Sequence, residues 1–212
     1  MEKARSAGNR RGQRSRQEIL DAALRLMAER GYAGTSVAVL SEVAGMPKSL
    51  IYHHFHSKGG LLSAVMEHGA HEFFAGMRRA HADPPVDGTH LERLRWYLGR
   101  TAEVFAQSPD FLRLHLLMLM SSESADVEIG PVIAQVRDDG RAYMIEQIAG
   151  AYADLGPERA TALATRLGYF AIAGFDGAFV ASQGDAARDI VAQMRDLAEA
   201  IDAWAERLIP QL

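Results

Sequence analysis

The sequence predicts an all-α protein of about nine helices, in which a small N-terminal helix-turn-helix domain precedes a larger helical domain. Apolar residues recur at intervals of three and four through most of the 212 residues, which is the spacing of one helical face. Glycine and proline separate these periodic segments, and no convincing alternation of apolar and polar residues indicates a strand. We expect a flexible basic tail at residues 1–14, a first domain at 15–69 and a second domain at 70–212.

The first predicted helix covers about residues 16–30. Ser15 and Glu18 have the S-x-x-E spacing of a capping box, and Gly31 is a natural stop. One face of this helix would hold the apolar residues Ile19, Ala22, Ala23, Leu26 and Met27. The tail before it is rich in arginine and poor in apolar residues, so we expect it to be mobile in the free protein.

Two short helices joined by a tight turn are predicted over residues 36–55. Thr35 and Ser36 are candidate N-caps of the first of them, and Gly45 ends it. Pro47 can begin the second, because the amide of a first-turn residue has no intrahelical partner. This is the helix-turn-helix arrangement, whose second helix lies in the major groove of DNA.

The second of these helices divides into an inner and an outer face. Ile51 and Phe55 are four residues apart and are needed for the small core. The outer face would then present the polar residues Lys48, Ser49, Tyr52 and His53. Such side chains suit phosphates and base edges, although any solvated helix can carry them.

Six more helical segments are predicted after the helix-turn-helix. Ser57 caps a fourth helix, and the run Asp83–Gly88 is a clear break. The later segments cover about residues 91–105, 109–122, 131–155, 158–183 and 185–208, with a loop at 121–130.

Composition limits the classes of function. Cysteine is absent, which excludes disulfides, thiolate catalysis and cysteine-ligated zinc. Neither a run of about 18 apolar residues nor an apolar stretch after the basic N-terminus is found, so we expect neither a membrane span nor a secretory signal. The lack of cysteine fits a reducing cytoplasm, where we expect the protein to associate with the nucleoid. Residues 1–60 hold 10 Lys/Arg and 5 Asp/Glu, whereas the remaining residues hold 13 and 22. A basic front end suits contact with phosphates, and the acidic remainder would face away from them.

One set of motifs in a single register spans about 50 residues. It consists of Ile19-x-x-Ala22-Ala23-x-x-Leu26, Gly31-Tyr32-x-x-Thr35-Ser36-Val37, Val43-Ala44-Gly45-Met46 and Ile51-Tyr52-His53-His54-Phe55-x-Ser57-Lys58-x-x-Leu61-Leu62. With these motifs, residues from Ser15 to Gly69 resemble the DNA-binding domain of the TetR family of repressors. The rest of the chain resembles that family only as an all-α domain.

The resemblance implies a DNA contact for each of eight residues. Base-facing positions would be Lys48, Ser49 and Leu50, and phosphate or base contacts would come from Tyr52 and His53. Phosphate contacts are implied for Thr35, Ser36 and, at the positive end of the fourth helix, Lys58.

This chain departs from the family pattern at several positions. Pro47 replaces the usual Ser or Thr cap, and Leu50 could contact a thymine methyl group. Gly59 and Gly60 stand where an acidic residue is usual after Ser-Lys. Because glycine inside a helix costs roughly 0.5–1 kcal/mol relative to alanine, we hypothesise a locally loose start of the fourth helix.

The resemblance further implies a homodimer that binds double-stranded operator DNA, and a repressor that a small, mostly apolar effector releases. Activation is also possible. Candidate pocket residues, although residues at helical spacing are more often simply core, are Trp96, Phe105, Phe111, His115, Met118, Tyr143, Phe170 and Phe175. The candidate dimer interface, a stripe that could instead bury against its own domain, comprises Leu167, Gly174, Ile190, Met194, Leu197, Ile201 and Trp204. The alternatives are control by a protein partner, and a small helical enzyme or ligand carrier.

Neither a catalytic nor a metal site is expected. No Ser/His/Asp, paired-carboxylate or glycine-rich phosphate motif stands out. His53, His54 and His56 are close in sequence, but neighbouring helical residues point about 100° apart, whereas a metal needs converging ligands. We expect His54 to be a packed or capping residue, and we expect no cofactor.

Overall fold

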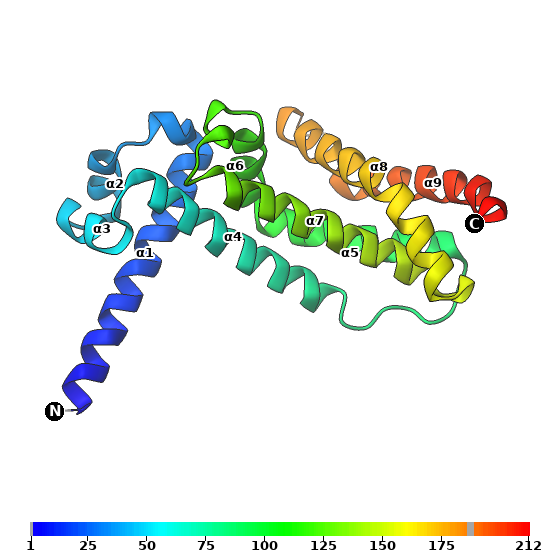
Figure 1. Cartoon of the computed structure of the whole chain (residues 1–212), viewed down its shortest axis with the longest axis horizontal. Helices are drawn as coiled ribbons and strands as arrows, with labels where there is room; N and C mark the ends of the chain where they lie inside the picture. Colours follow the sequence, from blue (N-terminus) through cyan, green and yellow to red (C-terminus); the bar gives the residue numbers. More distant parts are fainter. Residues whose placement is uncertain (1, 186–188) are drawn as a thin grey trace. The chain divides into compact units, whose positions relative to one another are not determined.

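The computed structural model describes residues 2–185 and 189–212, with side chains from residue 11 onward, and every regular element in these ranges is a helix (Figure 1). The helices are α1 (Glu2–Gly34), α2 (Val37–Ala44), α3 (Lys48–Phe55), α4 (Lys58–Ala80), α5 (His90–Gln107), α6 (Pro109–Leu119), α7 (Gly130–Ala151), α8 (Pro157–Gly184) and α9 (Ile190–Leu208). Three short 3-10 turns are η1 (Ser122–Ala125), η2 (Ala153–Leu155) and η3 (Ile209–Gln211). The predicted all-α class is confirmed for the described residues.

The chain forms two compact units. The first contains the residues up to Phe73 together with Pro109–Val136, and the second contains Phe74–Ser108 and Arg137–Leu212. The first unit therefore adds α6 and the start of α7 to the contiguous domain expected at residues 15–69. Helix α4 runs without interruption through the expected boundary.

Helix α1 begins earlier than predicted. It includes residues 2–14, which the sequence suggested would be a tail outside the helix. Ser15 consequently lies inside the helix, where its hydroxyl donates to the Gly12 carbonyl at 3.0 Å, so the predicted capping box at Ser15 was wrong. The segment from Arg11 to Arg16 contains no proline, and Arg14 pairs with Glu18 one turn later at 2.8 Å, so nothing breaks the helix there. The predicted stop at Gly31 appears as a kink with φ 73°.

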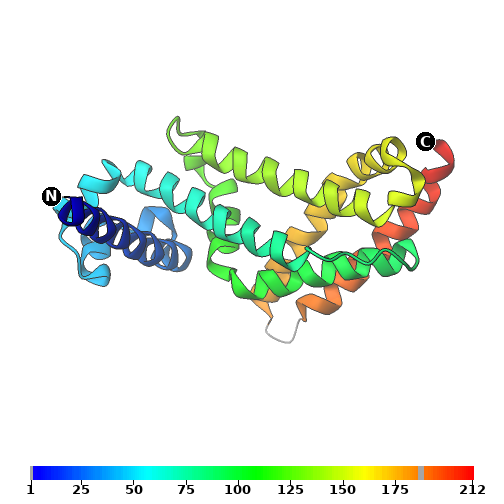
Figure 2. The same cartoon turned by 90° about the horizontal axis from the view of Figure 1, so that it is seen from below.

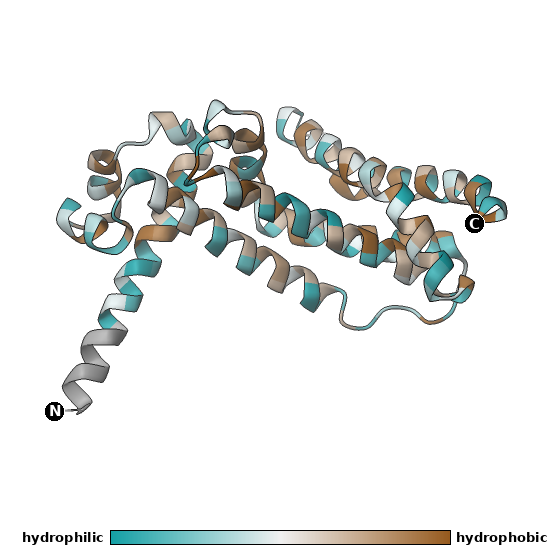
Figure 3. Ribbon diagram, in the orientation of Figure 1, coloured by the Kyte–Doolittle hydropathy of each residue, from teal (hydrophilic) through white to brown (hydrophobic). Residues whose placement is uncertain are grey.

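The core of the first unit is built around α1. Its buried residues include Ile19, Leu20 and Met27, and α2 and α3 add Leu40 and Ile51. Helix α6 packs on α1 within this unit. Figure 3 shows apolar residues along the inner faces of these helices.

Helices α5, α8 and α9 pack together in the second unit, and Figure 2 shows α9 lying along α5. The Phe105 ring of α5 meets the Phe175 ring of α8 edge to face, with centroids 3.7 Å apart. Gly174 allows α9 to approach α8, because a Cβ there would collide with the Leu197 side chain. Helix α5 begins with a capping box between Thr89 and Glu92, close to the predicted start.

A half-buried histidine in the second unit, directly after the last residue of α4, contacts α5 and α7. The His81 Nε2 atom lies 3.0 Å from the Tyr97 carbonyl, and Nδ1 lies 3.0 Å from the Tyr143 hydroxyl. A neutral ring with its proton on Nε2 satisfies both contacts, because Nε2 then donates and Nδ1 accepts. Burial lowers the pKa of His81 below its ordinary value of 6.5.

Acid should therefore destabilise the protein through His81. Since the unfolded chain takes up this proton at a higher pH than the folded chain, the contribution to stability is present above 6.5 and is lost as the pH falls through the lowered pKa. We expect a lower urea midpoint at about pH 5 than at about pH 7.5, and a smaller difference in His81→Gln, whose amide can keep both contacts. An equal acid-induced loss in His81→Gln would contradict this assignment.

Candidate nucleic-acid interface

Local hydrogen bonds define the helix-turn-helix. The Ser36 hydroxyl accepts from the Val39 amide at 3.2 Å and caps α2, as predicted. Gly45 ends α2 with φ 65°, a left-handed conformation that glycine adopts at low cost. The Ser41 hydroxyl donates to the Met46 carbonyl at 2.6 Å and holds the turn. Helix α3 then follows Pro47, which provides no side-chain cap.

The exposed face of α3 is polar, as predicted. Ile51 and Phe55 are buried. Tyr52 is 48% exposed and Leu50 is half-buried. The remaining exposed positions on this helix are Lys48, Ser49 and His53. A short, firmly anchored helix with hydroxyl, imidazole and ammonium groups on its free face can meet phosphates and base edges.

Thr35 does not reach this face, so the structure corrects its expected phosphate contact. The residue is only 1% exposed, and its hydroxyl donates to the Gly31 carbonyl at 2.9 Å. It secures the kink at the end of α1 instead. Ser36, the next residue, is exposed at the start of α2, where its hydroxyl caps the helix.

Lys58 stands at the start of α4, as predicted, but its ammonium group faces an aromatic ring. Its Nζ atom lies 4.1 Å above the centre of the Tyr32 ring, in a cation–π contact. Burial lowers the pKa of Lys58 below its ordinary value, and the nearby Glu123 carboxylate opposes that change. Burial also raises the pKa of the Tyr32 hydroxyl, with further contributions from the acidic residues Asp126, Glu123 and Glu128.

Helix α1 supports α3 through contacts that the sequence did not indicate. The Ser15 hydroxyl lies 3.2 Å from His54 Nε2, and the Arg16 guanidinium lies 5.2 Å from the centre of the Phe55 ring. Burial is the largest cause that lowers the pKa of His54, followed by the charges of His53 and Arg16. His54 is thus a packed residue, as expected. The motif spacing could not show the contact with Ser15, which lies 39 residues away.

The other histidines do not converge. His68 contacts Gln17 at 2.6 Å and Asp21 at 3.4 Å. Within the described side chains, no three His, Cys, Asp or Glu residues gather as metal ligands would.

No helix in the described ranges has both the length and the apolar character required to cross a membrane.

The eight candidate pocket residues fall in both units. Phe111, His115 and Met118 are buried on α6 in the first unit, where the Phe111 and His115 rings stack with centroids 6.2 Å apart. The other five are in the second unit. Phe105 and Phe175 are buried against each other in its core.

The three remaining candidates lie near the surface of the second unit. Tyr143 and Trp96 both border the His81 ring, with centroid distances of 5.8 and 5.7 Å. Phe170 is 41% exposed and packs edge to face on Trp204, with centroids 5.3 Å apart. Phe170 therefore lies on an outer surface of the second unit.

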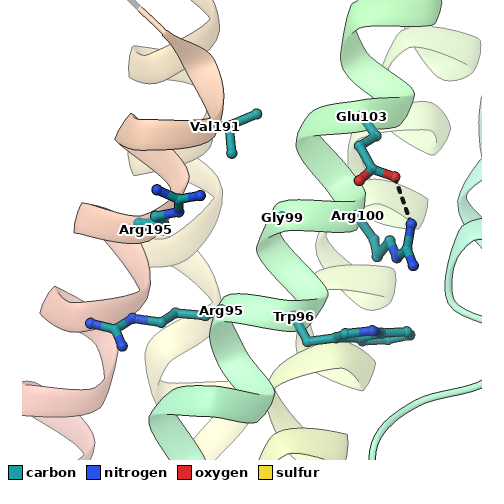
Figure 4. A pocket seen from close by; sticks show the side chains of 7 residues that line it. All are labelled: Arg95, Trp96, Gly99, Arg100, Glu103, Val191 and Arg195. Carbon is teal, nitrogen blue, oxygen red and sulfur yellow. Dashed lines mark hydrogen bonds and ion pairs between the residues drawn. The ribbon is translucent and has the colours of Figure 1, made fainter.

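A groove of about 310 Å³ lies between α5 and α9 (Figure 4). Its lining includes three arginines beside the apolar side chains of Trp96 and Val191, and comprises Arg95, Trp96, Gly99, Arg100, Glu103, Val191 and Arg195. Arg95 extends from α5 toward α9 and pairs with Glu199 at 2.6 Å, while Arg100 pairs with Glu103 at 3.0 Å. Trp96 is the one predicted pocket residue in this lining. The groove is more cationic than the mostly apolar pocket we expected.

The predicted dimer residues divide into core and surface. Leu167, Met194 and Ile201 have no exposed surface, because they pack within their own subunit. Leu197 is also buried, against Gly174 of α8. The apolar stripe that predicted an interface is therefore mainly the core-facing side of α8 and α9, and the assignment of these residues is corrected. Trp204 remains exposed, and Ile190 is half-buried.

A different apolar face of α8 and α9 is open. On α8, its members follow the spacing of one helical face, namely Tyr169, Phe170, Ala173, Gly177 and Val180. On α9, Ala200, Ala203 and Trp204 are exposed. Large exposed apolar side chains that cluster in this way mark an interaction surface.

Known proteins match the N-terminal part of the chain in sequence. Residues 19–65 match the family model described as "Bacterial regulatory proteins, tetR family". The regulator AcrR of Shigella flexneri is 42% identical over 55 residues, which are 26% of each chain. The activator FasR of Mycolicibacterium smegmatis is 34% identical over 84 residues, covering 37% of this chain and 38% of FasR. These sequence matches thus span only about a quarter to two fifths of the curated relatives.

Solved structures match nearly the whole chain in fold. A transcriptional regulator from Pseudomonas aeruginosa PAO1 has a TM-score of 0.73 at 21% identity and covers 92% of both chains. FadR from Bacillus subtilis, in complex with stearoyl-CoA, has a TM-score of 0.64 at 20% identity, covering 87% of this chain and 96% of FadR. A regulator from Saccharomonospora viridis, in complex with choline, has a TM-score of 0.68 at 20% identity, covering 90% and 96%.

Proposed function

Because residues 19–65 form an N-terminal domain of the tetR family, we propose that this chain is a sequence-specific, DNA-binding transcriptional regulator rather than an enzyme. The observation that carries the proposal is the exposed polar face of α3 on a helix-turn-helix whose first helix is capped at both ends and whose core residues Ile51 and Phe55 are buried. Operator DNA of a bacterial cell lies in the cytoplasm, so the proposal includes that location.

In the proposed complex, α3 lies in the major groove. Lys48 and Ser49, at its N-terminal end, contact base edges, and Leu50 can meet a thymine methyl group. Tyr52 donates its hydroxyl to a phosphate, and His53 meets a phosphate or a base edge. Contacts with DNA phosphates provide most of the affinity, so the affinity falls steeply as the salt concentration rises.

The exposed apolar face of α8 and α9 supports a homodimer. Phe170 and Trp204 form its aromatic centre, and small residues such as Ala173 and Gly177 allow a second copy to approach closely. Two copies of this face would meet around a twofold axis, which is the commonest arrangement of identical subunits. A twofold dimer would read a nearly palindromic operator with one α3 in each half-site.

The second part of the proposal is control by a small molecule. Two proteins of the same fold were solved with stearoyl-CoA and with choline bound. We propose a small, mostly apolar effector that releases the protein from DNA. Matched relatives include both the repressor AcnR of Corynebacterium glutamicum and the activator FasR of Mycolicibacterium smegmatis, and we propose repression as the default mode. Such a ligand acts only if it binds the DNA-competent and DNA-incompetent conformations with different affinities.

Replacement of Tyr52 tests the proposed DNA-binding face. DNA selected from a random-sequence library by the wild-type protein provides the probe. We expect Tyr52→Ala to lower the affinity by roughly threefold to tenfold, as for the loss of one hydrogen bond with a typical net contribution of about 1 kcal/mol, without changing the oligomeric state. Gel shifts at several salt concentrations measure the affinity, and light scattering measures the oligomeric state.

Val86→Ala is the control, because Val86 is exposed in the connection between α4 and α5. Unchanged affinity in Tyr52→Ala would refute the role of this residue. If the wild-type protein selected no sequence at moderate salt, the proposed function itself would be wrong.

A further inference from the structure

A carboxylate from the connection between α6 and α7 lies at the start of α4. The Ser57 hydroxyl is 3.1 Å from both carboxylate oxygens of Glu128, to which it donates. The same hydroxyl accepts from the Gly60 amide at 2.7 Å. Glu128 is thereby linked through Ser57 to the first turn of α4, although 71 residues separate Glu128 from Ser57.

The two glycines of α4 leave room for this carboxylate. A Cβ on Gly59 would collide with the Glu128 carboxylate. A Cβ on Gly60 would lie 2.5 Å from the Phe55 carbonyl oxygen and 3.1 Å from Glu128 Oε1. The glycine pair that we expected to loosen α4 therefore makes space for an acidic group from elsewhere in the chain. These contacts lead us to expect an ordered first turn.

The backbone around Glu128 is itself held. Its amide donates to Asp126 Oδ1 at 2.8 Å, and its carbonyl accepts from the Ser63 hydroxyl of α4 at 3.0 Å. The side chain and the main chain of Glu128 thus both contact the first two turns of α4. Helix α7 begins two residues later, at Gly130.

The link between α3 and α4 is strained where Glu128 acts. His56 has φ 62° and ψ −47°, and the Ser57 amide donates to the Phe55 carbonyl at 2.7 Å. This is a γ-turn of the rare type with positive φ, which a residue with a side chain adopts only at a cost. Such a turn persists when its surroundings hold it. Ser57, the last residue of the turn, is the residue that Glu128 binds.

We propose that Glu128 is a positioning residue for DNA binding. Its negative charge stabilises the positive N-terminal end of α4, and its bond to Ser57 holds the turn that ends α3, the proposed recognition helix. An acidic residue is usual directly after Ser-Lys, where this chain has Gly59 and Gly60. Here the α6–α7 connection supplies the acidic group instead. This inference rests on the proposed DNA-binding function.

Removal of the carboxylate gives the first test. Glu128→Ala should lower affinity for the selected DNA about threefold to tenfold, because a smaller fraction of molecules then holds α3 in the binding geometry. Glu128→Gln, which can still accept from Ser57, should retain an intermediate affinity. Glu67→Ala changes the net charge equally at an exposed position of α4 and should stay within about twofold of the wild type.

Restoring the charge from a different position gives the second test. In the absence of the Glu128 side chain, the space beside residue 59 is free, so Glu128→Ala combined with Gly59→Glu should recover most of the affinity. Glu128→Ala with Gly59→Ala fills the space without a charge and should recover less. Amide exchange at Gly60 and Leu61 should be slow in the wild type, faster in Glu128→Ala and slow again with Gly59→Glu.

If the wild-type protein binds DNA, three results would overturn the inference. They are unchanged affinity in Glu128→Ala, tighter binding in Glu128→Ala, and equal recovery by Gly59→Ala and Gly59→Glu. Tighter binding would mean that the carboxylate competes with DNA phosphates. A wild-type protein that binds no DNA would instead contradict the proposed function.

Discussion

Phe170→Asp should convert the protein from a dimer to a monomer and lower its affinity for operator DNA by at least about 100-fold. The Phe170 and Trp204 rings form the centre of the exposed apolar face on α8 and α9. An aspartate there would be buried without a partner when two copies meet, which costs several kcal/mol at each of two symmetric positions. A monomer then loses the gain in effective concentration that a second linked α3 provides.

Sedimentation velocity measures the oligomeric state, and gel shifts measure the affinity. Val86→Asp introduces the same charge at a residue that is 86% exposed and lies outside this face, so it should remain dimeric and bind DNA normally. A Phe170→Asp protein that stays dimeric at micromolar concentration would show that the subunits associate through another surface.

Phe105→Ala should lower the free energy of unfolding by about 3–5 kcal/mol. The Phe105 side chain is fully enclosed between two other rings of the second unit, Phe175 at 3.7 Å and Phe179 at 6.1 Å between centroids. Its truncation removes apolar burial and leaves a cavity that the surrounding helices cannot fill completely.

Urea unfolding followed by circular dichroism measures this cost, and Val86→Ala serves as a surface control with a change below about 0.5 kcal/mol. The result also separates the two interpretations of Phe105 that the sequence left open. A residue of the packed core gives the full cost, whereas a cost below about 1 kcal/mol would contradict the core assignment and favour the wall of a ligand cavity.

Much of the helix-turn-helix could be predicted because its determinants are local. Ser36 caps α2 through an amide three residues later, and Gly45 ends the helix within the same short segment. Ile51 and Phe55 share a face by helical periodicity alone, so the opposite, polar face of α3 followed from counting residues. The spacing also predicted the periodic helices of the second domain to within a few residues.

Periodicity was less informative about what covers a helical face. The stripe through Met194 and Ile201 was assigned to a dimer interface, but it is the core of the subunit. The apolar spacing shows that residues share one side of a helix, and it does not distinguish a partner helix of the same chain from one of another copy. The same limit placed Phe170, which is exposed, among the pocket residues.

By itself, the sequence determined the all-α class, the helix-turn-helix and the residues on the free face of α3, because caps, turns and periodicity act over a few residues. Only the tertiary structure decided that Thr35 is buried, that α6 joins the first unit and that Glu128 occupies the space left by Gly59 and Gly60. The physical reason is that these contacts join segments far apart in the chain. Ser57 and Glu128 come into contact only after the helices between them have packed, so no local sequence pattern predicts this contact.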